Sequence, residues 1–138
     1  MGRLPPLDVL AADLVAAADY QRYARPRLDA NALAYLEGGA ADELTCQANL
    51  NAWQDWALLP RLLRDLRGGH SRCQLLGDTL QHPILLAPVA YQQMFHPEGE
   101  RAMALAAGVM GGAAVLSAYA STPLEAVAEA GTGPLWFQ

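Results

Sequence analysis

The chain has 138 residues, of which 53% are hydrophobic and 17% are charged, and its formal net charge is −5. The acidic balance, with no basic stripe to offset it, excludes a nucleic-acid partner. So few charges predict an isolated fold with much apolar surface, as a piece of a larger core would have.

Helical signals dominate residues 1–70, which we interpret as an N-terminal helical segment. Pro5-Pro6 precede a helical pattern that Pro26 interrupts, in which Leu10, Leu14, Ala17 and Ala18 fall on one face at spacings of three and four. A second helix is predicted over 29–37, ended by two glycines. A third helix, which Asp42 can cap, is predicted to run to about residue 56. Its two tryptophans are expected to pack: Trp53 and Trp56.

Strand and helix signals alternate along residues 71–138, the predicted second domain. Gly77-Asp78 between short apolar runs predicts a β-hairpin. The continuous apolar run 84–87 is typical of a strand buried on both faces. A proline and acids in the first turn predict a helix over 97–110.

The alternation continues to the last residue. Residues 113–116 predict a second strand, and residues 135–138 predict a third. Between them, Thr122-Pro-Leu-Glu125 is a capping box with proline at the first helical position, and this helix should end near Gly131. The rhythm predicts an α/β fold, with its chemistry at the carboxyl ends of parallel strands. An eight-stranded barrel needs about 250 residues, so the chain is expected to be the opening third of an enzyme.

One uncharged stretch, Ala102–Leu124, is long enough to span a membrane and contains Gly108 and Gly112 at the spacing of a helix-pairing motif. It is rich in alanine and glycine, and Gly111-Gly112 interrupts it. A buried helix, a tight turn and a buried strand explain it better, so we predict no membrane span.

The two cysteines, Cys46 and Cys73, lack the spacing of a metal site. We interpret them as buried free thiols in a reducing cytosol rather than as a disulfide. No apolar segment typical of a signal peptide is found at the N-terminus. The expected location is therefore cytoplasmic, and no metal site is expected.

The residues at the predicted strand ends are Pro88-Val89-Ala90, Ser117 and Gln138, none of which is a strong acid or base. Backbone groups, a hydroxyl and an amide suit a flat heterocycle, because an amide offers both the donor and the acceptor that an imide-like ring edge requires. Strands often end in serine or glutamine, however, and Ser117 could simply satisfy backbone groups.

Longer motifs carry a resemblance that covers about Asp19 to Gln138. They are Tyr35-Leu-Glu-Gly-Gly-Ala-Ala-Asp-Glu-Leu-Thr45, Asn49, Leu59-Pro-Arg-Leu-Leu-Arg-Asp65, Leu86-Ala-Pro-Val-Ala-Tyr-Gln-Gln-Met94, His96-Pro-Glu-Gly-Glu100, Leu116-Ser117, Ser121-Thr-Pro-Leu-Glu125 and Trp136-Phe-Gln138. With these motifs the chain resembles the N-terminal part of the FMN-dependent 2-hydroxy acid oxidases and dehydrogenases, which include glycolate, lactate and hydroxymandelate oxidases.

The resemblance implies N-terminal helices, a β-hairpin and the first three strands of a (β/α)8 barrel with FMN at the strand ends. It implies that the backbone of Pro88, Val89 and Ala90 lies against the flavin ring near N5. Ser117 and Gln138 would hydrogen-bond the pyrimidine side of the ring. Val89 departs from the threonine of plant glycolate oxidases, so a contact from that hydroxyl is absent.

The resemblance also implies two substrate contacts, Tyr35 to the carboxylate of a small 2-hydroxy acid and Tyr119 beside its side chain. A core-aromatic role for Tyr35 remains the alternative. The family's catalytic histidine, arginine and lysine find no match, because the chain has no lysine and its three histidines do not align with the base. His82 and His96 are expected to shape turns or bond backbone groups, and His70 to be an exposed loop residue.

Two hypotheses follow for function. In the first, the intact enzyme oxidises a 2-hydroxy acid such as lactate, glycolate or mandelate to a 2-keto acid through FMN, and the 138-residue chain alone is inactive. In the second, the chain is a truncated, non-catalytic piece that is stabilised by a complementary C-terminal chain or by a second copy of itself.

Overall fold

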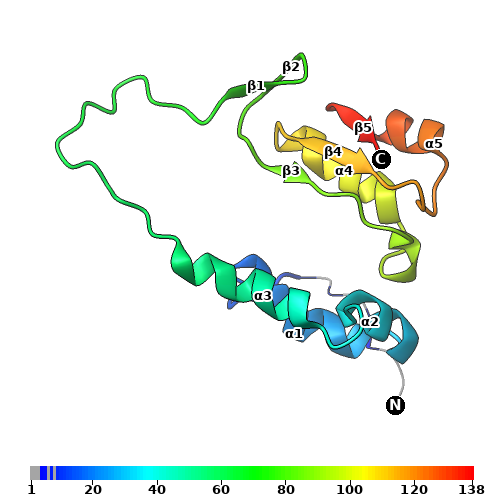
Figure 1. Ribbon diagram of the computed structural model, residues 1–138. Coiled ribbons are helices and arrows are strands. Elements are labelled where there is room, and N and C mark those ends of the chain that lie inside the picture. The colour runs from blue at the N-terminus through cyan, green and yellow to red at the C-terminus, as the bar shows by residue number, and fades with distance from the viewer. Residues whose placement is uncertain (1–3, 6, 8) are drawn as a thin grey trace. The chain divides into compact units, whose positions relative to one another are not determined.

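The computed structural model describes residues 4, 5, 7 and 9–138. The chain divides into two compact units, Met1–Arg64 and Asp65–Gln138, and each is described here by itself (Figure 1). The sequence-based division into domains at residue 70 stays a prediction.

Among its described residues, the first unit forms short helices and no strand. They are the 3-10 helix η1 (Ala17–Asp19), α1 (Tyr20–Ala24), η2 (Arg25–Arg27), α2 (Ala30–Glu37), α3 (Leu44–Ala52) and η3 (Trp53–Asp55). The helical pattern predicted between the prolines is confirmed only from Ala17, where η1 begins and α1 follows, whereas Leu10 and Leu14 lie outside any helix. The Asp19 Oδ2 atom accepts the N–H groups of Val15 and Ala16 at 2.9 and 2.7 Å, which holds Ala16 extended ahead of the helix.

The helix predicted over 29–37 is confirmed as α2. Its N-cap is Asp29, whose carboxylate accepts the N–H groups of Asn31 and Ala32, as a capping aspartate should. Asp42 is not the cap predicted for α3. The N-cap of α3 is Glu43, in the left-handed region at φ +58°, and its Oε1 atom accepts the Gly39 N–H at 2.9 Å.

Two predictions of burial in the first unit were wrong. Trp53 and Trp56 are 78% and 80% exposed, so they do not pack in a core of this unit. Cys46 is exposed as well, whereas Cys73 in the second unit is partly buried, and both thiols are free. Apolar periodicity marks the face that could be buried, but the nine residues of α3 meet no layer within this unit that buries that face.

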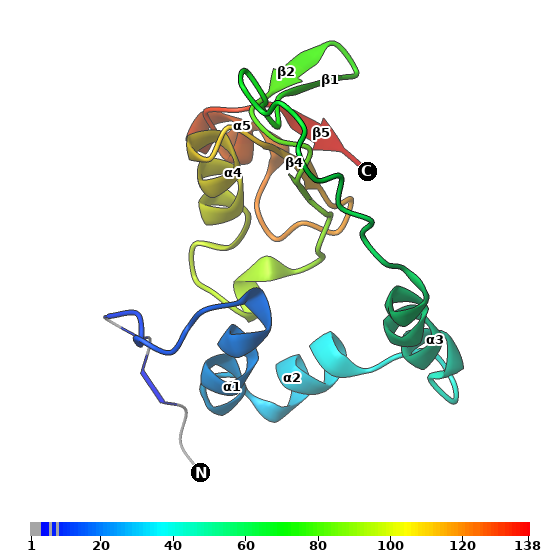
Figure 2. The same ribbon diagram turned by 90° about the vertical axis from the view of Figure 1, so that its left-hand side faces the viewer.

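The second unit is the mixed α/β structure expected from the alternation. Its strands and helices are β1 (Cys73–Leu75), β2 (Asp78–Leu80), β3 (Leu85–Leu86), η4 (Gln92–Met94), α4 (Gly99–Val109), β4 (Ala113–Leu116), α5 (Leu124–Ala130) and β5 (Leu135–Phe137). Strands β3, β4 and β5 form a parallel sheet in that order, and β1 and β2 form an antiparallel hairpin. In both views α4 and α5 lie beside the sheet (Figures 1 and 2).

The hairpin turn lies one residue earlier than predicted. Leu75 pairs with Asp78, so the turn residues are Leu76 and Gly77, at φ +50° and +94°. Positive φ at both positions is the geometry of a type I′ hairpin turn. The hairpin is tied to the start of β4, because the Gln81 N–H donates to the Gly111 carbonyl at 2.9 Å.

The core of the second unit joins its helices to its central strand. Ala104 of α4, Leu116 of β4 and Val127 of α5 pack together and are almost fully buried. The strand predicted from the run 84–87 exists as β3, but the prediction of burial on both faces was wrong, since Ile84 is 67% exposed. Among the described residues β3 pairs with β4 alone, so it is an edge strand with little cover.

The uncharged stretch 102–124 forms most of α4, then β4 and the start of α5. No helix within the described part of the chain is long and apolar enough to cross a membrane. The two spaced glycines of this stretch, Gly108 and Gly112, lie where other backbone segments approach closely. A Cβ atom on Gly108 would lie 2.6 Å from the Gly133 nitrogen, and one on Gly112 would lie 2.9 Å from the Ile84 carbonyl oxygen.

Replacing Gly108 with alanine is expected to destabilise the second unit. The new methyl group would meet backbone at Gly133, which cannot move aside as a flexible side chain can. Overpacking of this kind costs about 1–3 kcal/mol, against about 1 kcal/mol gained in helix propensity. Hydrogen exchange of the β4 amides should therefore become faster by up to about 30-fold.

The exposed α4 residue Val109 provides the control, and V109A should leave exchange within about twofold. Slower exchange in G108A than in the parent would contradict the close approach, because the gain in helix propensity would then exceed any cost of overpacking.

Candidate functional site

The candidate site lies at the carboxyl edge of the parallel sheet. Ser117 directly follows β4, Gln138 directly follows β5, and Pro88–Ala90 follow β3 after one residue. Leu116 pairs with Phe137, and the Gln138 N–H donates to the Leu116 carbonyl at 2.9 Å. Since neighbouring parallel strands run the same way, these three segments lie at one edge of the sheet.

Ser117 is 4% exposed, and its hydroxyl has a local partner. Its Oγ atom accepts the Tyr119 N–H at 3.1 Å, and its carbonyl accepts the Ala120 N–H at 3.0 Å. The Ser117 hydroxyl therefore does satisfy a backbone N–H group, which was the alternative to a ligand-binding role. A hydroxyl that accepts a hydrogen bond can still donate its own proton, so Ser117 retains a donor for a ligand.

Tyr119 is exposed on the loop after β4 and contacts the loop after β3. Its ring centroid lies 6.0 Å from that of Tyr91, and its carbonyl accepts the Tyr91 N–H at 3.0 Å. Tyr91 has φ +52°, a left-handed conformation that costs a bulky residue about 1–3 kcal/mol. Such a conformation persists where the surrounding contacts hold it.

Glu100 is the residue of this region that the sequence did not reveal. Its pattern indicated only an acid in the first turn of a helix, yet its side chain is fully buried. Oε1 accepts the N–H groups of Ser121 at 2.7 Å and Gln92 at 3.2 Å, and Oε2 accepts the Thr122 hydroxyl at 2.8 Å. No local signal separates it from Glu98, the exposed acid two residues earlier, because its partners lie in other segments.

The Thr122 contact also corrects the predicted capping box. The Thr122 hydroxyl donates to Glu100, and α5 begins at Leu124 with Pro123 at the N-cap position and no side-chain cap. The N-cap position falls on Pro123, whose side chain has no acceptor for the N–H groups of the first turn, so the predicted cap is absent. The start and end of α5 still agree with the prediction to within two residues, ending at Gly131.

The buried carboxyl group of Glu100 is ionised at neutral pH. Burial raises its pKa, but the N–H of Ser121, its own backbone N–H, the Thr122 hydroxyl and the N–H of Gln92 outweigh that effect. Together they hold the pKa of Glu100 below its usual value. Hydrogen bonds donated to a carboxylate favour the charged form in this way.

The histidines bond backbone groups, as predicted. The Ile84 N–H donates to His82 Nδ1 at 3.3 Å, which makes Nε2 the donor to the Met110 carbonyl at 3.0 Å. The Glu98 N–H donates to His96 Nδ1 at 3.3 Å, and His70 is exposed. Within residues 4, 5, 7 and 9–138, no group of three His, Cys, Asp or Glu side chains could hold a metal ion.

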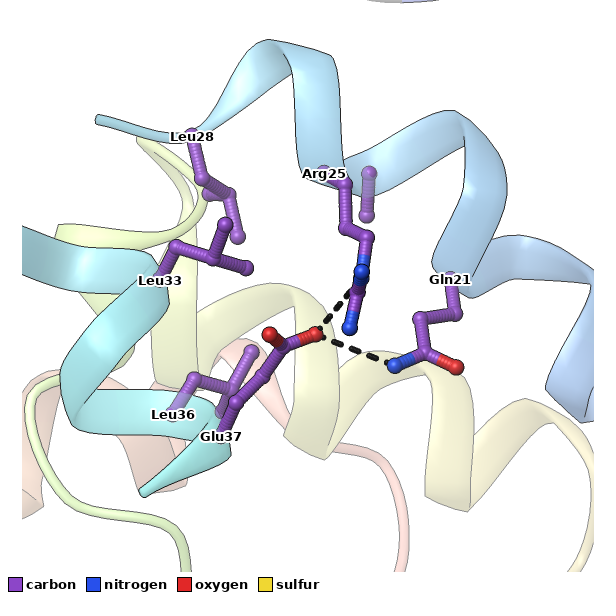
Figure 3. A pocket seen from close by; sticks show the side chains of 7 residues that line it. Gln21, Arg25, Leu28, Leu33, Leu36 and Glu37 are labelled. Carbon is purple, nitrogen blue, oxygen red and sulfur yellow. Dashed lines mark hydrogen bonds and ion pairs between the residues drawn. The ribbon is translucent and has the colours of Figure 1, made fainter. Parts of the chain in front are cut away.

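Tyr35, the predicted substrate contact, belongs to the first unit, where it lies on α2 and is 52% exposed. A core-aromatic role within this unit therefore does not fit. A hollow of about 590 Å³ lies beside the same helix, lined by Arg25, Glu37 and others, but it contains no predicted site residue. Figure 3 shows Gln21 and Arg25 pointing toward Glu37, whose Oε1 atom accepts from them at 3.0 and 2.8 Å. This partly exposed ion pair is worth at most about 1 kcal/mol.

Comparison with known proteins identifies the family. The sequence model described as FMN-dependent dehydrogenase matches residues 24–138. The chain belongs to this family. The resemblance seen in the motifs is thereby confirmed, and the strand ends described above lie inside the matched range.

Individual relatives agree with this assignment. The chain is 45% identical over 135 residues to the L-lactate oxidase of Alicycliphilus denitrificans, covering 98% of this chain and 37% of that protein. It is 39% identical to the 4-hydroxymandelate oxidase of Amycolatopsis orientalis, covering 90% and 34%. It is 37% identical to the glycolate oxidase of Spinacia oleracea, covering 87% and 32%. The chain thus spans about a third of the length of these relatives.

Solved structures match as well. A mandelate oxidase with (S)-4-hydroxymandelic acid gives a TM-score of 0.85 at 39% identity, over 90% of this chain and 35% of that one. A mandelate oxidase variant that carries a C4a-OH-FMN adduct gives 0.83 at 38% identity, over 87% and 36%. At 38% and 39% sequence identity, the structural similarity supports the same family assignment as the family model does.

Proposed function

We propose that this chain acts as the N-terminal part of an enzyme that oxidises a small 2-hydroxy acid to a 2-keto acid with FMN. The family match over residues 24–138 supports the cofactor, and the lactate, glycolate and hydroxymandelate oxidases among the relatives support the substrate class. In this proposal β3, β4 and β5 are the first three strands of a closed eight-stranded barrel. Their parallel order, with α4 and α5 as the connections, supports that assignment.

The carboxyl edge of the sheet fits a flavin ring. The observation that carries this proposal is the placement of Ser117 and Gln138 on neighbouring strand ends, joined through the bond from the Gln138 N–H to the Leu116 carbonyl. A nearly buried hydroxyl and an exposed amide supply the donors and the acceptor that the pyrimidine side of the ring requires. The small Ala90 leaves room for the ring to lie against the backbone of Pro88–Ala90. FMN, when bound, supplies the acceptor for the hydride equivalents.

The substrate contacts are proposals of the same kind. Tyr35 donates its hydroxyl to the substrate carboxylate, and Tyr119 lies beside the substrate side chain. Tyr119 is 66% exposed on the loop after β4, so its ring is available to a ligand. The partner class is a small 2-hydroxy acid, and the cytoplasmic location stays a prediction.

A specific observation also favours the second candidate, a piece stabilised by association with a complementary chain or a second copy. Four leucines that follow the first unit's helices are at least 83% exposed: Leu58, Leu59, Leu62 and Leu63. In addition, among the described residues β3 and β5 each pair on one side only. Apolar side chains and open strand edges of this kind are typical of surfaces that another chain covers.

A fusion enzyme tests the proposed function. It joins this chain, after Gln138, to the part of the Alicycliphilus L-lactate oxidase that follows the matched segment. We expect the purified fusion to bind FMN, seen as yellow colour and flavin absorbance, and to convert lactate to pyruvate. A folded fusion that binds no FMN would contradict the proposal, because every flavin contact assigned to this chain would then be unsupported.

Replacing Gln138 with leucine in the fusion is expected to weaken FMN binding. The substitution removes a donor and an acceptor, and leaving a buried polar partner unpaired costs about 1–3 kcal/mol, a factor of about 5 to 150 in Kd. Titration of the flavin-free fusion with FMN, followed by fluorescence, measures the Kd. The exposed Gln74 on the hairpin provides the matched control, Q74L. An equal Kd in both variants would count against the role of Gln138.

A further inference from the structure

Two loops leave the carboxyl edge of the sheet, and a single buried side chain binds both. The β3 loop comprises residues 87–98, and the β4 loop comprises residues 117–123. Glu100, in the first turn of α4, accepts one hydrogen bond from the β3 loop, at Gln92, and two from the β4 loop, at Ser121 and Thr122. The partners lie 8, 21 and 22 residues away along the chain.

Further bonds join the same two loops directly. The Gln93 N–H donates to the Ser121 hydroxyl at 3.3 Å, and the Gln93 amide donates to the Thr122 hydroxyl at 3.4 Å. The Tyr91 N–H donates to the Tyr119 carbonyl at 3.0 Å. These bonds are longer or neutral, whereas the bonds to Glu100 are charge-assisted and include the shortest, at 2.7 and 2.8 Å.

The chemistry of this junction calls for a carboxylate. All three partners are donors, and an ionised carboxylate is an acceptor only, with room for several donors. A glutamine of the same shape can keep its oxygen on the two N–H groups, but its NH₂ group must then donate to the Thr122 hydroxyl, which reverses that bond and takes the Glu100 acceptor away from the hydroxyl proton. The substitution also removes the charge that strengthens all three bonds, and no solvent replaces it, since Glu100 is 0% exposed.

We propose that Glu100 is a positioning residue that holds the β3 loop and the β4 loop at the separation that FMN requires. The inference rests on the proposed function, since the segments it positions are Pro88–Ala90 and Ser117–Tyr119. Glu100 itself touches neither the flavin nor the substrate. It acts through the backbone of Gln92 and Ser121 and through the hydroxyl of Thr122.

The test uses E100Q in the fusion enzyme, with two controls. E98Q removes an exposed acid from the same turn, and G108A destabilises α4 at its other end without touching either loop. Hydrogen exchange at Gln92 and Ser121 is measured in the flavin-free protein at 15 °C. The FMN Kd and the visible circular dichroism of the bound flavin are measured at the same temperature, after far-UV circular dichroism has shown which variants are folded.

We expect E100Q to speed exchange at Gln92 and Ser121 by at least about tenfold, to raise the FMN Kd by about tenfold and to alter the flavin dichroism. G108A should lower the unfolding temperature but keep the Kd and the dichroism of the parent, and E98Q should change none of these. If E100Q only lowers the unfolding temperature, as G108A does, the positioning role is wrong and Glu100 is merely structural.

A second variant covers the case in which E100Q does not fold. T122V removes one hydroxyl of the junction at nearly constant shape, and we expect it to raise the FMN Kd by about three- to fivefold with the same change in dichroism. A folded T122V with the parent Kd and spectrum would overturn the inference. A parent fusion without FMN contradicts the proposed function instead, so the two failures are distinguishable.

Discussion

The 138-residue chain by itself is expected to oxidise lactate, glycolate or mandelate at no rate above the buffer blank, even with FMN added. None of its histidines is placed as a base by the family motifs, and His82 and His96 are engaged with backbone groups. The chain also contains no lysine. Loss of a positioned base costs about 10²–10⁴ in rate, and loss of charge stabilisation costs about 10²–10³ more.

The structure of the sheet leads to the same expectation. Three parallel strands cannot close a barrel, and the described strands β3 and β5 each keep one open edge. We therefore expect the isolated chain to aggregate, to form oligomers, or to require a partner chain. Size-exclusion chromatography with light scattering measures this, and keto-acid formation measures turnover.

The fusion enzyme is the positive control for both measurements. In a second experiment, the C-terminal part of the lactate oxidase is added to the isolated chain as a separate polypeptide. This mixture should regain some activity if the two pieces associate. A monodisperse, cooperatively folding monomer of the isolated chain that reduces FMN with any of the three acids would overturn the expectation.

Replacing Tyr35 with phenylalanine in the fusion is expected to lower kcat/KM for lactate at least about tenfold. One hydrogen bond to a charged group is worth about 1.5–3 kcal/mol, a factor of about 10 to 150. The substitution removes only the hydroxyl. Because Tyr35 is half exposed on α2, its loss should cost little stability. Steady-state kinetics and thermal unfolding of the same preparation measure the two effects.

Tyr20 provides the matched control for this substitution. It is a similarly exposed tyrosine of the first unit, at 48%, and no motif assigns it a role. Y20F should retain the parent kinetics. If Y35F keeps the parent kinetics but unfolds at a lower temperature, Tyr35 has a structural role and the substrate contact is wrong.

Much of the local structure could be read from the sequence because its causes are local. The helix over 29–37 exists as α2, Gly131 ends α5, and 113–116 is a strand, each as predicted. The alternation of strands and helices also predicted which residues stand at strand ends, Ser117 and Gln138 among them. These features depend on turn chemistry, capping and periodicity within about ten residues.

One prediction failed for a local reason: the helical pattern after Pro5-Pro6 begins only at Ala17, and Asp19 binds the N–H groups of Val15 and Ala16 just ahead of it. Predictions of burial failed where the covering partner is not a neighbour in the sequence. The run 84–87 is apolar enough for burial on both faces, but β3 has only one neighbouring strand. An apolar sequence pattern indicates which side chains can be buried. They are buried only where another strand or helix packs against them.

The sequence by itself determined the family, the order of strands and helices, and the polar residues at the strand ends. Only the tertiary structure decided the burial and the hydrogen bonds of Glu100, because its three partners lie on two loops outside its own helix. Glu98 and Glu100 have the same residue type on the same turn, yet one is exposed and the other fully buried. Burial and hydrogen bonding across loops depend on how segments pack, and no pattern within a single segment carries that information.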